Sequence, residues 1–595
     1  MKLLRLFILL TSILSCSHKK PLEPRPETVG QKPTWIIQSD EFALQFSKDL
    51  AGIFPEAGSE LGFAEFDSKG VLLENDIDAK VRALFVKWVE KTDARIQSTK
   101  DIELRTDFQV LKDWLNDQIA NIDSSNNEHE VEFSPGTQTV FQYLQSLNNP
   151  QSPPERKKAS IDRFKVYVHG DATHRPLLLA MEEKFEHEVK KYQGQKPFFI
   201  FEGEVKEYLK DSASYMTGIK EMLIGSNRYD WGADWDKFVL QAKRYDDFTK
   251  KVVLTKARKD PRIPVHVYEQ ILKRRAIQMS ATALIQKGTT DYKKLYVAFK
   301  DQALVVAKKN KLKNTDPASV IKFLKSKPVT DIKKIEELYK TADQRLEKIM
   351  RDNNLISVPN FPLVIRVAGD AESKAAPVPH LQPPPLINNR GERPEFVVPS
   401  ATEGLPFDDF SSLDSAMVLT AHEGRPGHDM QFSQMLDKGI SFIRGTYAAN
   451  NVNIEGWALY AEDLVYPYLN EEEKLFALQM RLWRIARMFL DPQLQLGQIK
   501  DQKVFDIYMK ELGVSKAMAS LELRRYKYAD IGQAPSYYEG YLMVKSMRDE
   551  MQTRMKEKFN LKCFNDTLLS FGLLPLKISA ERMKNDFNCS GPLAP

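Results

Sequence analysis

The 595-residue sequence lacks three features that mark common classes of protein. Positive charge is not in excess, since 86 Lys and Arg stand against 81 Asp and Glu, which gives no reason to expect nucleic acid as a partner. The apolar run near the N-terminus is too short to span a bilayer as a finished helix. Only three cysteines are present, and neither Cys563 nor Cys589 has a second Cys or a His at metal-ligand spacing.

The first sixteen residues, MKLLRLFILLTSILSC, fit a secretory signal, because two basic residues precede a short apolar run. Ser15 and Cys16 fit a bacterial lipobox, although Ile13 replaces the commoner Leu. We therefore predict a lipoprotein signal peptide over residues 1–16, with Cys16 as the lipidated residue that anchors the exported chain to a membrane. Because Ser17 rather than Asp follows, we expect the outer membrane, facing the periplasm. The alternative is a plain signal peptide that is cut nearby.

Three further regions follow the signal. Residues 17–38 are polar and proline-rich, which predicts a tether. We predict an N-terminal helical region over residues 39–370. We predict a second helical region over residues 371–595, which contains the candidate metal site discussed below. In an oxidising compartment Cys563 and Cys589 could form a disulfide worth about 3 kcal/mol, whereas two free buried thiols are the alternative.

Helical periodicity dominates the chain and predicts a mainly α fold. In VRALFVKWVEKTDARIQ, for example, Val81, Phe85 and Trp88 recur at helical spacing. The frequent lysines between 237 and 334 are typical of the solvated side of helices. Near Ala375 the sequence becomes rich in Pro, Gly and Asn, and Glu395–Val398 is a short strand candidate between prolines. We expect an edge strand there, which could pair with a peptide backbone; simple packing of a loop on the core is the alternative.

Of the nine histidines, one pair lies in a sequence typical of a metal site. The segment is AHEGRPGHDMQ, which contains His422, Glu423 and His428. Catalytic zinc takes three protein ligands, often two His and a carboxylate, and lowers the pKa of a water towards about 7. A neighbouring Glu can then take the proton from that water. Here the histidines are six residues apart, so on one unbroken helix their rings would diverge. Pro426 and Gly427 predict a broken turn that returns His428 to the side of His422.

Glu455, which opens EGWALYAE on a separate predicted helix, is the best candidate for the third ligand. Glu462 lies seven residues further on the same face and could be a partner of a ligand or a rival ligand. Alternatively, Glu455 caps a helix or pairs with an Arg. A second His–Glu dipeptide, His187 and Glu188, is set aside because Lys191 occupies the fourth position.

Four ordered motifs resemble those of the bacterial domain-of-unknown-function 885 (DUF885) family, whose members are relatives of zincin metallopeptidases with a glutamate ligand. They are RGERPEFVVP, HEGRPGHDMQ, EGWALYAEDL and LELRRYKYADIGQAPSYYEG, and the resemblance extends from about residue 40 to 590. It implies a large helical fold around a deep channel with a small β element next to the metal helix. It also implies one zinc ion bound by His422, His428 and Glu455, with Glu423 as general base.

The last of the four motifs, LELRRYKYADIGQAPSYYEG, is called the late motif here. By the resemblance, it places Tyr537 where a stabiliser of the oxyanion would be expected, with Arg525 and Gln533 as weaker candidates. Read without the family, Tyr537 would be a core or channel aromatic. One departure is Gln495, which stands where many relatives have a histidine. If that histidine assists the binding of substrate or transition state, Gln495 could keep the hydrogen bond but not the charge, and activity would be altered or reduced.

The resulting hypothesis is a zinc peptidase that hydrolyses peptides of the cell envelope, with Glu423 moving the proton from water to the leaving amine. The first alternative is a catalytically inert lipoprotein of the same fold that binds peptides or envelope partners. The second is a structural envelope protein, which would contain no zinc.

Overall fold

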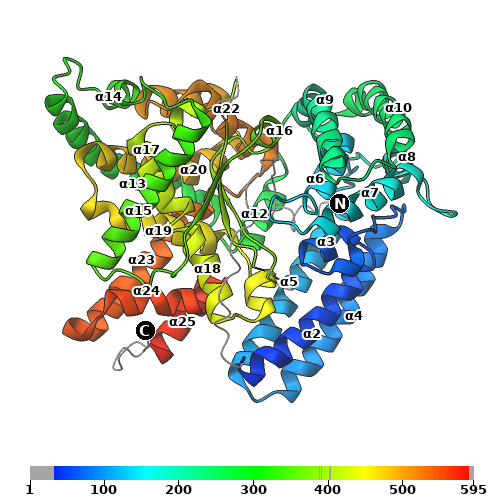
Figure 1. The fold of residues 1–595 in the computed structure, drawn as a ribbon, viewed down its shortest axis with the longest axis horizontal. Helices are drawn as coiled ribbons and strands as arrows, with labels where there is room; N and C mark the ends of the chain where they lie inside the picture. The colour runs from blue at the N-terminus through cyan, green and yellow to red at the C-terminus, as the bar shows by residue number, and fades with distance from the viewer. Residues whose placement is uncertain (1–31, 387–388, 390, 401–403, 588–595) are drawn as a thin grey trace.

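The computed structural model describes residues 32–386, 389, 391–400 and 404–587. Helices make up most of it, and a single three-stranded sheet lies near the middle of the molecule (Figure 1). The predicted mainly α fold with a small β element is confirmed. Among the described residues no helix combines the length and apolarity needed to cross a membrane.

The helices from α2 to α10 pack into two adjoining bundles on one side of the molecule, coloured from blue through cyan to green in Figure 1. In chain order they are α2 (Thr34–Ala51), α3 (Pro55–Glu60), α4 (Ile77–Ser98), α5 (Ile102–Asn127), α6 (Gly136–Gln145), α7 (Pro154–His169), α8 (Leu177–Lys191), α9 (Glu202–Gly225) and α10 (Gly232–Phe248). The predicted amphipathic helix is α4, whose Val81, Phe85 and Trp88 are buried.

A second group of helices leads to the sheet and builds the opposite side. They are α11 (Leu254–Lys256), α12 (Val265–Arg274), α13 (Ala281–Lys309), α14 (Pro317–Leu324), α15 (Ile332–Asp352) and α16 (Asp370–Ala375). After the sheet come α17 (Leu413–Glu423), α18 (His428–Lys438), α19 (Asn451–Val465), α20 (Glu471–Gln495), α21 (Asp501–Phe505), α22 (Lys516–Arg524), α23 (Ser536–Met555), α24 (Leu561–Ser570) and α25 (Leu576–Asp586).

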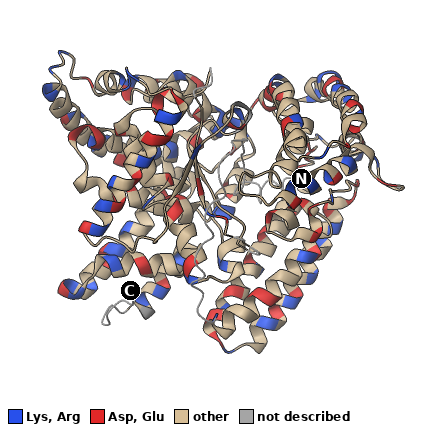
Figure 2. Cartoon of the chain, viewed as in Figure 1, with Lys and Arg blue, Asp and Glu red and all other residues tan. Residues whose placement is uncertain are grey.

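Short 3-10 and π-helical turns connect several of these elements. They are η1 (Ala64–Phe66), η2 (Thr249–Val253), η3 (Phe407–Asp409), η4 (Ile443–Tyr447), η5 (Tyr466–Tyr468), η6 (Asp506–Glu511), η7 (Arg525–Ala529) and η8 (Lys556–Lys558). Charged side chains of both signs are interspersed along the helices in the view of Figure 2.

The sheet consists of β1 (Val364–Val367), β2 (His380–Gln382) and β3 (Glu395–Val398), in the order β1-β3-β2. β3 is parallel to β1 and antiparallel to β2. The predicted strand at Glu395–Val398 is confirmed, but its assignment as an edge strand is wrong. The flanking prolines lie outside the strand and therefore do not prevent pairing. β3 is paired with β1 on one edge and with β2 on the other, and all of its residues are buried.

The predicted tether is too long at its C-terminal end. α2 begins at Thr34, so the last residues of 17–38 are already helical. Ile36 is buried, and the ring of Trp35 stacks beneath the guanidinium of Arg444 at 4.6 Å. These two apolar residues bind the start of α2 to the folded body, which the proline-rich composition did not indicate.

α19 and α23 lie against each other more closely than side chains would normally permit. A Cβ at Gly456 would fall 2.5 Å from the carbonyl carbon of Gly540, and a Cβ at Gly540 would fall 2.0 Å from the carbonyl oxygen of Val452. Two glycines at the crossing therefore let the two backbones touch. This contact places the residues at the start of α23 beside Glu455 of α19.

Candidate metal centre

The helix that carries His422 ends one residue later, and a new helix begins at His428. The side chain of Ser412 caps the start of α17, and α17 is buried along most of its length. Pro426 and Gly427 lie in the break between the helices. The centroids of the two imidazole rings are 5.0 Å apart, and the ring planes are 82° apart. The predicted broken turn is confirmed, and it brings together two histidines six positions apart.

Gly427 is the residue that makes this break sterically feasible. A Cβ at this position would lie 1.8 Å from the carbonyl oxygen of His422, so any side chain would force the backbone apart. Trp457 of α19 fixes the break from outside, because its Nε1–H donates to the carbonyl oxygens of Pro426 at 3.0 Å and Gly427 at 3.2 Å. The helix that supplies Glu455 therefore also holds the turn between the histidines.

Gly427→Ala should separate the two imidazoles and lower zinc affinity. Because the clash is with backbone rather than with a flexible side chain, we also expect a loss of about 1–3 kcal/mol in the free energy of unfolding. Zinc titration and thermal unfolding measure the two effects. Gly232→Ala is the matched control, since a Cβ there meets nothing within 4 Å. A Gly427→Ala variant with unchanged zinc affinity would contradict this role of the turn.

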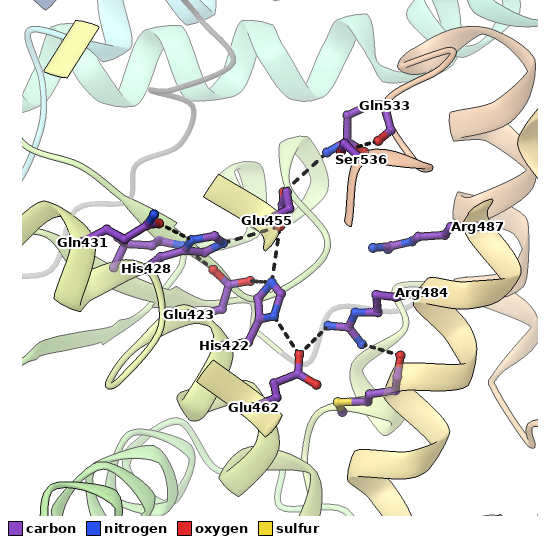
Figure 3. Close-up of polar contacts among 12 residues, drawn as sticks. His422, Glu423, His428, Gln431, Glu455, Glu462, Arg484, Arg487, Gln533 and Ser536 are labelled. Atoms are coloured by element: carbon purple, nitrogen blue, oxygen red, sulfur yellow. Dashed lines mark hydrogen bonds and ion pairs between the residues drawn. The ribbon is translucent and has the colours of Figure 1, made fainter. Parts of the chain in front are cut away.

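Three donor atoms from three helices converge on one point (Figure 3). Oε2 of Glu455 lies 3.4 Å from Nε2 of His422 and 3.5 Å from Nε2 of His428. Bonds of about 2.0–2.1 Å to a tetrahedral zinc ion separate its ligand atoms by about 3.3–3.4 Å. The spacing of these donors therefore fits zinc with little movement.

The chemistry of the donors also fits a cation. Oε2 of Glu455 is buried and has no hydrogen-bond partner among the described residues, which is costly for a carboxylate unless an ion binds it. Burial alone would lower the pKa of His422, but the nearby carboxylates of Glu455, Glu462 and Glu423 raise it to about 9. Three carboxylates thus surround this imidazole, and a divalent ion bound there would offset their charge.

Glu423 is a geometric rival for the third ligand, because one of its oxygens lies within 4.8 Å of ligand atoms of both histidines. Two observations favour Glu455 instead. Oε1 of Glu423 is 4.0 Å from Nε2 of His422, farther than Oε2 of Glu455. Its other oxygen, Oε2, accepts a hydrogen bond of 2.9 Å from the backbone N–H of Leu381 in β2. Glu423 thus lies beside the three donors, where a base would act on a ligand of the ion.

The remaining nitrogens of the two rings are held from behind. Nδ1 of His422 lies 2.7 Å from Oε1 of Glu462, and Nδ1 of His428 lies 3.4 Å from Oε1 of Gln431. A carboxylate or amide oxygen can only accept, so both Nδ1 atoms carry hydrogen, and Nε2 is the atom of each ring that would bind a metal, which would displace any proton there. Of the two roles considered for Glu462, the geometry fits the partner of a ligand.

Glu462→Gln should weaken zinc binding about 10-fold to 100-fold without removing the site, because the amide oxygen still accepts from His422 but no longer carries charge. A competition titration with a chelator measures the affinity. Asp463→Asn is the control, since Asp463 pairs with Arg481 at 2.8 Å instead of with a histidine. Equal zinc affinity of wild type and Glu462→Gln would show that this carboxylate does not tune the site.

The late motif approaches Glu455 from the other side. Nη1 of Arg525 donates to Oε1 of Gln533 at 2.7 Å, and Nε2 of Gln533 lies 3.4 Å from Oε1 of Glu455. Arg525 thereby fixes which way the Gln533 amide faces. Gln533 thus contacts Oε1 of Glu455, the oxygen that does not face the histidines, and Arg525 contacts Gln533. Both residues therefore support the ligand Glu455.

Tyr537, at the start of α23, lines the cavity that reaches Glu455, as do residues 528–531 of the same motif. Its ring lies nearly parallel to that of His422, with centroids 6.2 Å apart, and it lines a large cavity. The guanidinium of Arg487 covers its face at 4.4 Å. Burial raises the pKa of Tyr537, so its hydroxyl remains a hydrogen-bond donor. Arg487 was not anticipated from the sequence, because nothing in α20 indicates which residue faces the motif.

Gln495 lies away from the metal centre. Its Oε1 accepts from the backbone N–H of Ile263 at 3.1 Å, and its Nε2 donates to the carbonyl oxygen of Tyr526. Both polar atoms of the Gln495 amide are therefore bonded to backbone groups, and neither is directed at a substrate in the cavity, as the sequence had suggested. Gln495 ties the segment before α12 to η7 and does not line the cavity.

A cavity of about 590 Å³ opens onto the centre. Its walls come from both halves of the chain, including α5, α12, β2, α19 and the start of α23. Glu423, His428, Glu455 and Tyr537 line one wall, and the side chains of Glu423 and Glu455 are each 12% exposed. The cavity therefore supplies a path from solvent to an otherwise buried site.

A second carboxylate cluster, Asp78, Glu132 and Glu188, also has metal-like spacing. Nζ of Lys184 already occupies it, at 2.8 Å from Asp78 and 2.6 Å from Glu188. His187 is exposed and takes no part in it. Lys184 thus pairs with these carboxylates, and the His187–Glu188 dipeptide forms no metal site with them.

Of the three cysteines, only Cys563 lies within the described residues, where it is buried and disulfide-bonded. Cys16 and Cys589 lie outside them.

Solved structures show the same fold. A candidate lipoprotein of unknown function from Shewanella oneidensis aligns with TM-score 0.70 and 18% identity, over 92% of this chain and 100% of that one. A candidate lipoprotein from Colwellia psychrerythraea aligns with TM-score 0.74 and 17% identity, over 92% and 98%. A candidate oligoendopeptidase F from Bacillus anthracis reaches TM-score 0.24, too low to indicate a shared fold.

No curated protein matches the sequence. A family model does match, over residues 55–583, and its description is bacterial protein of unknown function, DUF885. This range contains all four motifs and every residue of the candidate metal centre. The chain belongs to the DUF885 family.

Proposed function

We propose that this protein is a zinc-dependent peptidase. The observation that carries the proposal is the position of Oε2 of Glu455. This buried oxygen lies between Nε2 of His422 and Nε2 of His428, and it accepts no hydrogen bond from the described residues. A second carboxylate, Glu423, stands beside these donors on the wall of a cavity. Two His and one Glu as ligands, with a second carboxylate alongside, are the parts of a hydrolytic zinc site.

The ion would supply a Lewis acid that acidifies a water and polarises the carbonyl of the substrate. Oε1 of Glu423 would take the proton from the attacking water and later deliver it to the leaving amine. The hydroxyl of Tyr537 would donate a hydrogen bond to the oxygen on which negative charge develops. Gln533 and Arg525 would hold Glu455 in its binding orientation.

The cavity indicates how a peptide would reach the site. Ligands that are this buried require the peptide bond to enter the cavity, and the mixed polar and apolar lining is typical of a pocket for a small ligand or an extended chain. We propose peptides of the cell envelope as substrates. We also propose an exported chain anchored by lipid at Cys16, at the outer membrane and facing the periplasm. The two structural relatives are candidate lipoproteins, which supports the lipid anchor. The choice of membrane is based on Ser17 alone.

A catalytically inert member of the same fold, which binds peptides through this cavity, is the second candidate. Elemental analysis of the purified protein, combined with turnover of a mixed peptide library, separates the two. The peptidase should contain about one zinc ion per chain and cleave members of the library. A zinc-loaded protein that cleaves none of them would favour the binding module, and a protein that cannot take up zinc would overturn both.

A further inference from the structure

The three-stranded sheet lies next to the general-base candidate, and one backbone group of the sheet touches it. The N–H of Leu381 donates to Oε2 of Glu423 at 2.9 Å. In the register of β2 and β3, Leu381 stands opposite Phe396. Alternate residues of an antiparallel strand direct their N–H away from the partner strand, and a single N–H proton can make only one such bond. The N–H of Leu381 therefore faces off the sheet, towards Glu423.

The sheet is held rigidly enough to place this group. Arg366 of β1 donates through Nε to Glu395 of β3 at 2.6 Å and through Nη2 to Glu372 at 2.7 Å, and all three side chains are buried. Gln151 adds a bond of 2.6 Å to the other oxygen of Glu395. Both carboxylate oxygens of Glu395 therefore fix the central strand β3, and β2 is paired with that strand.

The same scaffold is fixed relative to the helix that ends at Glu423. α15 packs against both β1 and α17. The ring of Tyr339 in α15 meets the ring of Phe396 edge-on, with centroids 5.2 Å apart. Because sheet and helix share this support, the distance between Leu381 and Glu423 is set by packing rather than by a flexible loop.

We propose that the backbone N–H of Leu381 is the positioning group for the general base. It holds Oε2 of Glu423 on the sheet, which leaves Oε1 directed at the metal centre, 4.0 Å from Nε2 of His422. The proposal rests on the proposed function for its catalytic consequence, whereas the contact itself does not. It also implies that a substrate cannot pair with β2 through this N–H, because Glu423 already occupies it.

Leu381→Pro removes the N–H, and Leu381→Ala is the matched control that keeps it. Proline is tolerated where the N–H points off the sheet, so pairing with β3 should survive. Loss of a hydrogen bond to a charged group predicts that kcat falls about 10-fold to 100-fold in Leu381→Pro relative to Leu381→Ala. KM and zinc content should be equal in the two variants. Equal kcat values would overturn the proposal.

Hydrogen exchange tests the contact without any turnover and without the proline variant. The segment 379–385 has few exchangeable amides, because positions 379, 383, 384 and 385 are prolines. In Glu423→Ala, mass spectrometry of a peptide covering this segment should show one amide that exchanges faster than in wild type. Unchanged exchange would overturn the proposal even if the enzyme is active. If the amide exchanges faster in Glu423→Ala but wild type cleaves no peptide, the contact between Leu381 and Glu423 is supported and the proposed peptidase function is not.

Discussion

His422→Ala should lose the metal. His422 supplies one of the three proposed ligand atoms, and its ring is buried at the end of α17, beside the break that leads to α18. The loss in zinc affinity should exceed the 10-fold to 100-fold typical of changes behind a ligand, so zinc content after dialysis should fall from about one ion per chain to near zero.

Elemental analysis of dialysed protein measures this result. His187→Ala is the control, because it removes the exposed histidine of the other His–Glu dipeptide and should keep the ion. A dialysed His422→Ala protein that is still zinc-replete would refute the assignment of this ligand.

Glu423→Gln should keep the metal and lose turnover. The glutamine is nearly isosteric and its carbonyl oxygen can still accept from Leu381, but it cannot take a proton from water at neutral pH. Removal of a general base typically costs about 100-fold to 10,000-fold in rate, and that loss should appear in kcat.

Steady-state kinetics on a peptide cleaved by wild type, with zinc analysis of the same samples, provides the measurement. Glu186→Gln, on an exposed surface, is the control and should match wild type. Full activity of Glu423→Gln would mean that the base lies elsewhere.

The elements that carry the site were predictable because each is a helix with local signals. α19 spans the residues of NVNIEGWALYAEDLV, so Glu455 does lie on a separate helix, as predicted. The break at Pro426 and Gly427 followed from the chemistry of those two residues. Local composition is enough for such features, because helix starts and breaks depend on near neighbours along the chain.

Features that depend on distant segments were not predictable in the same way. Flanking prolines suggested an edge strand at Glu395–Val398, but the order of strands is set by where β1 and β2 fold back. The contact between Glu423 and Leu381 spans 42 residues and uses a backbone group that has no sequence signature. Spacing placed Glu462 on the same face as Glu455 but could not choose between its two roles, because that choice depends on the orientation of the His422 ring.

The central claim is that one ion binds between His422, His428 and Glu455. Crystals of the protein grown with zinc, measured on both sides of the zinc absorption edge, test it most directly. An anomalous peak about 2.0–2.2 Å from Nε2 of both histidines and from Oε2 of Glu455 is the predicted result. Zinc-saturated crystals with no peak among these three atoms, or with zinc bound only at another place, would contradict it.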